Sequence, residues 1–256
     1  MNEIFKSGII VEQSDIEMKA NFNNGSLLSC NWMIEAYINF SNILSQNNFP
    51  CLFGRSAYKR KSLKFLFVNE IIDLQKGLLL YTDFIKKMPL EERLYSPLII
   101  TFRRIGFKNL TEEHEFCWEQ LKLLHSLDEA EWPNDIPKDP HDNQWTFCFD
   151  QTQLFFNMSC PSHHHIKSRN LGPYVTFVVN PRQNFDFVAS INTSKGVKIR
   201  QTIRERVKLY NDGFLPSELG FFGDDDNFEW KQYQLTEPNS ISTKVCPFSA
   251  KKSKSL

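Results

Sequence analysis

Three consecutive histidines stand in a segment whose side chains could bind a metal ion. The run Cys160-Pro161-Ser162-His163-His164-His165 holds half of the six histidines, and Lys167 and Arg169 follow it. Neutral imidazoles bind transition metals and haem iron, while lysine and arginine donate hydrogen bonds to carboxylates and phosphates. Adjacent histidines are not by themselves a metal-site spacing. A solvated loop therefore explains the run equally well.

The six cysteines offer a second kind of metal ligand. They are Cys30, Cys51, Cys117, Cys148, Cys160 and Cys246, and no two of them form a C-x-x-C pair. This spacing argues against a zinc knuckle or a thioredoxin-like site. Several lie in apolar surroundings, where a thiol behaves as a small hydrophobic side chain. Because no segment resembles a secretory signal, we expect all six to be reduced.

Composition restricts the class of protein. The 256 residues include 30 Lys and Arg and 30 Asp and Glu, so the formal net charge is zero. This balance argues against nucleic acid or an anionic membrane as a dominant partner. No apolar run approaches the roughly 20 residues of a membrane span, and no G-x-G-x-x-G fingerprint of a flavin or nicotinamide site is present. We expect a cytoplasmic protein.

Hydrophobic patterning predicts the elements that position these residues. We expect helices at 26–46, 70–87, 111–127 and 195–210. We expect strands at 49–54, 62–68, 97–102, 145–149, 153–158 and 174–180. A basic loop with Arg55, Lys59, Arg60 and Lys61 would join the first two strands, and the proline-rich residues 132–143 would be irregular. The histidine run would then lie in a loop between two buried strands.

These elements mix helices and strands without a regular βαβ alternation, which predicts an α+β fold with a mixed or antiparallel sheet packed with helices. No composition shift marks a domain boundary. We therefore expect one domain at residues 26–250, preceded by a flexible polar leader at 1–25 and followed by a basic tail at 251–256.

Short motifs spread over residues 30–250 resemble the YqcI/YcgG family. They are Phe49-Pro50-Cys51, Trp132-Pro133, Ile136-Pro137-x-Asp139-Pro140, Trp145-x-Phe147-Cys148-Phe149, Pro161-Ser162-His163, Lys167-Ser168-Arg169, Asn180-Pro181-Arg182, Ile203-Arg204-x-Arg206, Leu219-Gly220-Phe221-Phe222-Gly223, Asp226-Asn227-x-Glu229-Trp230-Lys231-Gln232-Tyr233 and Cys246-Pro247-Phe248. Each motif alone is weak, but all of them occur in the family's order. The family pattern has Arg three residues after the motif histidine, and this chain has Ile166 there.

The resemblance implies a haem-dependent enzyme that uses O₂ and a separate electron donor to hydroxylate the nitrogen of a small amine or guanidine. The haem would be a non-covalent haem b, because the chain has no C-x-x-C-H attachment motif. Two other classes stay open. One is a haem-binding sensor or carrier without turnover, and the other is a zinc or mononuclear iron protein that uses His163 to His165.

The resemblance also implies candidate site residues. His163 matches the motif histidine and is the first candidate for the axial haem ligand, with Cys51 as its rival because a thiolate helps to cleave O₂. Arg55, Lys167 and Arg169 could hold the haem propionates. A cationic substrate needs a carboxylate and an aromatic face, for which the candidates are Asp226, Glu229, Trp230 and Tyr233.

Overall fold

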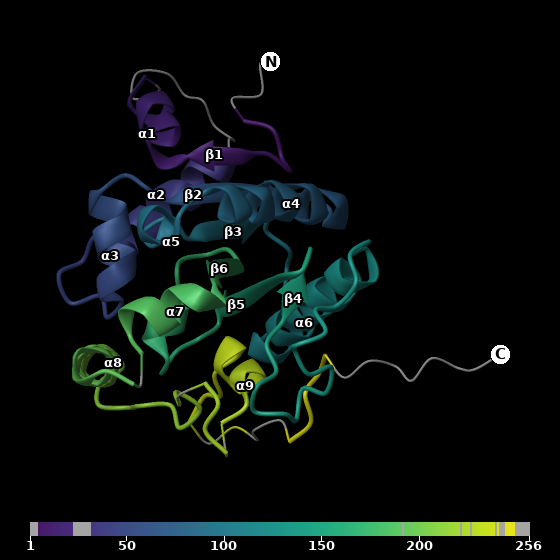
Figure 1. Cartoon of the computed structure of the whole chain (residues 1–256). Helices are drawn as coiled ribbons and strands as arrows, with labels where there is room; N and C mark the ends of the chain where they lie inside the picture. The colour runs from purple at the N-terminus through teal and green to yellow at the C-terminus, as the bar shows by residue number, and fades with distance from the viewer. Residues whose placement is uncertain are drawn as a thin grey trace.

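A mixed sheet runs through the middle of the protein (Figure 1), whose structure is a computed structural model that describes residues 5–22, 32–190, 192–220, 222–225, 227–238, 240 and 244–248. The strands have the spatial order β1-β2-β3-β6-β5-β4. They are β1 (Ile10–Glu12), β2 (Lys64–Val68), β3 (Leu98–Phe102), β4 (Cys148–Phe149), β5 (Thr152–Ser159) and β6 (Thr176–Pro181). Only β2 and β3 are parallel, and every other neighbouring pair is antiparallel.

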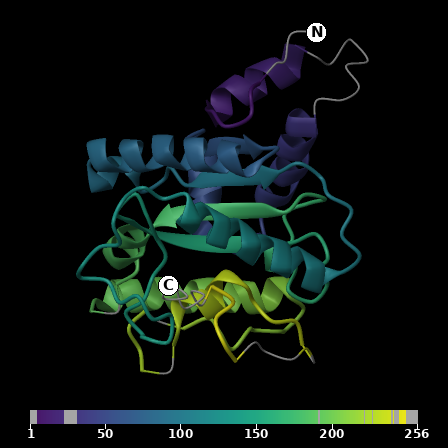
Figure 2. The same cartoon turned by 90° about the vertical axis from the view of Figure 1, so that its right-hand side faces the viewer.

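Helices surround this sheet. In the described residues they are α1 (Gln13–Phe22), α2 (Trp32–Leu44), α3 (Leu52–Lys59), α4 (Ile71–Lys87), α5 (Leu90–Arg93), α6 (Leu110–Ser126), α7 (Arg182–Val188), α8 (Ser194–Tyr210) and α9 (Glu229–Tyr233), with a short 3₁₀ helix at Lys167–Arg169. Figure 1 shows α3, α7 and α8 on one side of the molecule and α6 on the other, and the quarter turn in Figure 2 brings the α6 side to the front. The result is one α+β domain, as predicted.

Two hydrophobic cores lie against opposite faces of the sheet. Strand side chains alternate between faces, so in β2 Leu66 joins one core while Phe65 and Phe67 join the other. The first core is completed by apolar residues of α4, α6 and α9. The second is completed mainly by α1 and α2. The second face matters for function, because none of the buried residues that the structure describes in its core comes from β5 or β6.

Most predicted elements are present, with ends shifted by a few residues. Strands β2, β3, β5 and β6 and helices α4, α6 and α8 lie where the patterning predicts them, and residues 132–143 contain neither helix nor strand. The predicted helix at 26–46 corresponds to α2, and the part of it before residue 32 lies outside the described residues. The predicted strand at 145–149 is reduced to β4.

One prediction is wrong in a way that bears on the site. Residues 49–54 were expected to be a strand, with a basic loop after them, but Cys51 caps the helix α3 and Arg55 lies inside it. The apolar run from Phe49 to Phe53 favours a strand by composition. The chain forms a helix because the Cys51 side chain accepts a hydrogen bond from the backbone N–H of Gly54, as an N-cap residue does.

The N-terminal segment also contributes more than the sequence predicts. Residues 1–25 were expected to be a flexible leader, yet β1 pairs with β2 and Ile16 of α1 is fully buried. The expected tail at 251–256 lies outside the described residues. The five cysteines that the structure describes form no disulfide. No helix within the described ranges is long and apolar enough to cross a bilayer.

Candidate functional site

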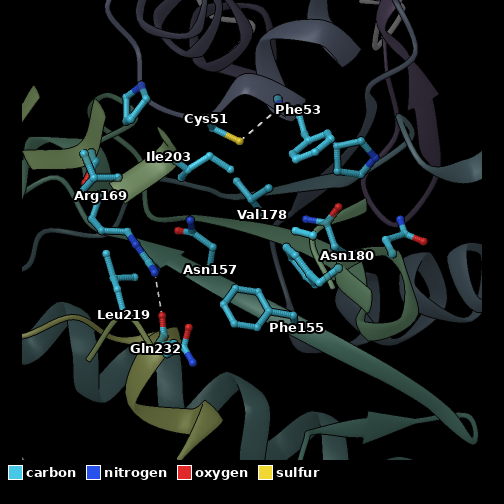
Figure 3. A pocket seen from close by; sticks show the side chains of 18 of the residues that line it. Cys51, Phe53, Phe155, Asn157, Arg169, Val178, Asn180, Ile203, Leu219 and Gln232 are labelled. Carbon is cyan, nitrogen blue, oxygen red and sulfur yellow. Dashed lines mark hydrogen bonds between the residues drawn. The ribbon is translucent and has the colours of Figure 1, made fainter. Parts of the chain in front are cut away.

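A cavity of about 300 Å³ lies on the second face of the sheet (Figure 3), at the low end of the volumes of ligand pockets. Its walls are formed by the C-terminal end of α2, the start of α3, the helices α7 and α8, and the first turn of α9. Apolar side chains make up most of the lining, among them Phe40, Leu44, Phe49, Phe53, Leu63, Ile99, Ile203 and Val207. The polar groups described below interrupt this lining at a few positions.

Alternate residues of β5 and β6 form the floor of the cavity. Phe155 and Asn157 of β5 and Val178 and Asn180 of β6 line the cavity and are half-buried, whereas the residues between them are buried. Cross-strand register places Phe155 beside Asn180 and Asn157 beside Val178. In Figure 3 both asparagine side chains lie on the floor below Cys51. These four side chains of β5 and β6 line the cavity.

Cys51 lies in the cavity wall opposite this floor (Figure 3). Cys51 is exposed, and desolvation by the surrounding protein nevertheless raises the pKa of its thiol above the usual 9.0, because it disfavours the thiolate. Two backbone N–H groups at the start of α3, those of Gly54 and Phe53, oppose this effect. Loss of the thiol proton is therefore disfavoured. A bound metal would reverse the balance.

A buried ion pair forms another part of the wall. The Arg182 guanidinium lies 2.9 Å from the Glu229 carboxylate, and both side chains are almost fully buried. Thr146 and Tyr233 also donate hydrogen bonds to Glu229, over 2.5 and 2.8 Å. Burial raises the pKa of Glu229 to about 7, although Arg182 and these two donors oppose the shift. The carboxylate is already engaged with three neighbours.

Arginines outnumber acids along the cavity. Arg169, Arg182, Arg200 and Arg204 line it against one carboxylate, that of Glu229, in the part of the chain that the structure describes. Arg169 is buried and donates to the backbone carbonyls of Tyr233 and Gln232 over 2.9 and 2.6 Å. Burial lowers the pKa of Arg169 to about 10. The lining thus favours a ligand that carries negative charge.

His163 lies outside the cavity lining. Its ring is buried, and its Nδ1 atom is 2.8 Å from Glu237 Oε1, while the backbone N–H groups of His164, His165 and Ile166 donate to the same carboxylate. Burial lowers the pKa of His163 below 6.5 despite Glu237. Its Nε2 atom has no hydrogen-bond partner among the residues that the structure describes. The contacts with Glu237 anchor the histidine loop, and the ligand role stays a prediction.

The remaining predicted residues are distributed differently. Arg169 and Glu229 line the cavity, but Arg55, Lys167, Trp230 and Tyr233 do not. Arg55 donates to Asn47, and Lys167 is exposed and pairs with Asp212. Trp230 and Tyr233 belong to the first core. Asp226 lies outside the described residues.

Ile166, at the position of the family's arginine, is fully buried. Within the described ranges, no group of three or more His, Cys, Asp or Glu side chains is placed to hold a metal ion.

The structure adds residues that the sequence analysis missed. They are the floor residues Asn157 and Asn180, together with Arg182, Asn184, Arg200 and Arg204. A signal was present for the first two, because each is a polar residue inside an otherwise apolar strand, and buried polar groups need a partner. Arg200 and Arg204 gave no such signal, since their spacing along α8 also suits a solvated helix.

An α+β fold with a thiol facing an arginine-rich interior cavity defines the class of this protein. The model of the YqcI/YcgG family matches residues 40–249. The chain belongs to this family. The match includes the Cys51 segment, the cavity floor and α8.

Three curated proteins are similar to this chain. A putative N(omega)-hydroxy-L-arginine synthase, DcsA, of Streptomyces lavendulae is 31% identical over 95% of this chain and 97% of its own length. The uncharacterized proteins YqcI and YcgG of Bacillus subtilis are 30% and 31% identical, over 85% and 79% of this chain and 87% and 81% of theirs. No solved structure matches.

Proposed function

We propose that this protein is a haem-dependent oxygenase that hydroxylates a guanidine nitrogen of arginine or a similar compound. The observation that carries the proposal is the Cys51 thiol, which faces an apolar cavity of ligand size from the start of a helix. The relative named as an N(omega)-hydroxy-L-arginine synthase supports the choice of a guanidine substrate. The proposed substrate is thus narrowed from any small amine or guanidine to arginine or a similar guanidine.

The residues present fit a haem. A flat ligand bound at Cys51 would face the floor formed by Phe155, Asn157, Val178 and Asn180 across the cavity. The cavity offers a soft sulfur ligand, which suits iron, and the surplus of arginines suits two propionates. A haem with a thiolate ligand supplies the O₂ activation that N-hydroxylation requires.

The geometry favours Cys51 over His163 as the axial ligand. Cys51 lines the cavity and His163 does not. The N–H groups of Gly54 and Phe53 would stabilise a thiolate at the N-terminal end of α3, where the helix dipole is positive. We therefore propose that Cys51 binds the iron, while His163 with Glu237 fixes the loop that ends at Arg169, whose side chain lines the cavity.

The chain's own polar groups would hold the substrate. Asn180 has no hydrogen-bond partner for its side chain among the described residues, and Asn157 accepts only from Ser159 Oγ, over 3.0 Å. These amides can hydrogen-bond a guanidine group, which Glu229 cannot readily do while it is bound to Arg182, Thr146 and Tyr233. The apolar walls exclude water from the reacting nitrogen.

The net reaction fixes what else is needed. One atom of O₂ enters an N–H bond of the guanidine, and the other leaves as water, which consumes two electrons and two protons. The sequence has no flavin or nicotinamide fingerprint. A separate protein would therefore supply the electrons.

The first prediction concerns the absorption spectrum. Protein purified from cells supplied with iron and haem precursor should show a Soret band, which Cys51→Ala should abolish or shift and His163→Ala should leave in place. Reduced protein under carbon monoxide should show the red-shifted band of a thiolate-ligated haem. With reductant and O₂, arginine should gain one oxygen atom from labelled O₂.

Other results would overturn the proposal. A spectrum without a Soret band after haem supply would exclude the haem assignment. A Soret band that His163→Ala removes and Cys51→Ala leaves intact would assign the ligand to His163. A haem protein that binds arginine without forming a hydroxylated product would favour a sensor or carrier.

A further inference from the structure

We propose that the face formed by α3, residues 47–50 and α8 binds a small acidic electron-transfer protein. We call it the basic face, and its exposed cations are Lys59, Arg60, Lys195, Lys198 and Lys208. The inference rests on the proposed function, because an oxygenase without its own electron source needs such a partner. Three features of the structure support this location.

The first feature is a segregation of charge that the zero net charge conceals. Residues 41–69 contain five Lys and Arg and no Asp or Glu, and α8 contains six Lys and Arg with Glu205 as its single acid. In contrast, residues 112–142 contain ten Asp and Glu and only two Lys. Figure 1 shows α3 and α8 on one side of the molecule and α6 on the other. Such an asymmetry orients a charged partner during its approach.

The second feature is the short chain segment that connects this face to the thiol. Arg206 of α8 donates to the carbonyls of Phe49 and Asn47, over 2.7 and 3.0 Å, and Arg55 of α3 donates to the carbonyl of Asn47 over 2.9 Å. Both helices therefore bind the backbone that leads directly into Cys51. Asn47 is exposed, so only a few residues separate the surface from the thiol. Electron transfer slows steeply with distance, which favours docking here.

The third feature is an exposed apolar residue within the basic surroundings. Leu209, next to Lys208 near the end of α8, is 79% exposed, more than any other large apolar side chain in the described residues. Protein interfaces place apolar contacts inside a polar rim, and electron-transfer complexes are small and guided by charge. A membrane surface fits less well, because Ile203 and Val207 of α8 line the cavity and are not available to lipid.

The test measures docking and electron transfer separately. The probes are a plant-type [2Fe–2S] ferredoxin and a flavodoxin, both acidic, at low ionic strength. Calorimetry with the oxidised probe measures binding, and stopped-flow absorbance with the reduced probe measures haem reduction. Photoreduced 5-deazariboflavin, a small uncharged reductant, bypasses docking. The variant Lys59→Glu/Lys198→Glu/Lys208→Glu reverses the basic face without touching the cavity lining.

We expect the wild-type protein to bind at least one probe, with a reduction rate that falls as salt is added. At low salt, the triple variant should bind the probe more weakly, and its haem should be reduced at least about tenfold more slowly. It should keep its Soret band and its reduction by deazariboflavin. The control Lys76→Glu/Lys122→Glu/Lys138→Glu makes the same charge change at exposed sites on α4, α6 and residues 132–143, and it should retain most of the wild-type rate.

Three results would overturn the inference. The first is that neither probe binds at low salt. The second is that both triple variants lose the same amount of probe binding and reduction rate. The third is that the wild type binds phosphatidylserine vesicles and only the basic-face variant loses this binding, while its rate of reduction by ferredoxin stays unchanged. Arginine hydroxylation driven by deazariboflavin would uphold the proposed function in each case. Conversely, if the protein takes up no haem after haem supply but still binds ferredoxin, the docking role of the basic face would stand and the haem-dependent oxygenase would be rejected.

Discussion

Side-chain chemistry at this site is set by surroundings rather than by residue type. Cys51, Cys117 and Cys148 all have a raised pKa because burial disfavours the thiolate. Only Cys51 faces the cavity and accepts hydrogen bonds from the start of a helix. The same contrast holds for Glu229 and Glu237. The first is held in an ion pair on the cavity wall, while the second binds His163 and the backbone of its loop.

At the residue scale, Glu229 should make stability depend on pH. Its pKa rises from 4.5 in the ordinary state to about 7 in the folded protein. Between these values the folded protein keeps a proton that the unfolded chain releases. The free energy that this proton contributes to the folded state is fully present below about pH 4.5 and is lost as the pH rises through about 7. Glu229→Gln should lack this decline in the free energy of unfolding.

Urea unfolding at intervals from pH 5 to pH 8 (about the span of the titration) would measure this effect on haem-free protein. Glu91→Gln is a suitable control, because this glutamate is exposed on α5. It should reproduce the wild-type pH dependence. An identical decline in Glu229→Gln would show that another group causes it.

At the element scale, the sequence predicts the helices and strands that have a periodic apolar pattern, and it misses those that depend on a single contact. Helix α4 and strand β3 follow from repeating apolar positions, so their position is recoverable within a few residues. Helix α3 does not follow, because its start depends on one hydrogen bond to Cys51. Strand β1 depends on pairing with β2, which lies about fifty residues further along the chain. Neither contact has a periodic signature.

The candidate site divides in the same way. The motif Phe49-Pro50-Cys51, Arg169 and Glu229 were found from the sequence, and all three supply residues to the cavity lining. The separation of His163 from this cavity could not be predicted, since it depends on the pairing of β5 with β6 and on the distant residue Glu237. The floor residues Asn157 and Asn180 become neighbours only through that pairing.

Close packing of α4 on the sheet gives a prediction at this scale. A Cβ atom on Gly77 would lie 2.2 Å from Leu66 Cδ1, and Leu66 is fully buried. Gly77→Ala should therefore destabilise the protein by about 1–3 kcal/mol through overpacking, although alanine favours a helix by about 1 kcal/mol. Urea unfolding would measure the change.

Gly106→Ala provides the matched control, because, apart from its two chain neighbours, no described residue has a heavy atom within 4 Å of the Cβ that it would add. Its effect should stay within about 0.5 kcal/mol of the wild type. A Gly77→Ala protein that is as stable as this control would show that α4 moves away from β2 at little cost.

At the scale of the whole molecule, composition and arrangement lead to different conclusions. A net charge of zero argued against nucleic acid or an anionic membrane as a dominant partner. Folding places the cation-bearing helices α3 and α8 on one side of the molecule and α6, which starts the acidic stretch 112–142, on the other. Secondary structure could be anticipated without this information. The basic face could not, since it requires two helices that are separated by more than one hundred residues to bind the same short segment before Cys51.

The open floor of the cavity leads to the last prediction, which concerns the stability of the entire domain. A ligand that binds only the folded state stabilises it by about 2.7 kcal/mol at one hundred times its Kd. For a domain of this size, each kcal/mol raises Tm by about 2–4 °C. Hemin added to haem-free protein should therefore raise Tm by about 5–10 °C. Cys51→Ala should lose most of this increase and His163→Ala should keep it, as scanning calorimetry can measure. Equal increases in the wild type and Cys51→Ala would mean that the haem binds without the thiolate.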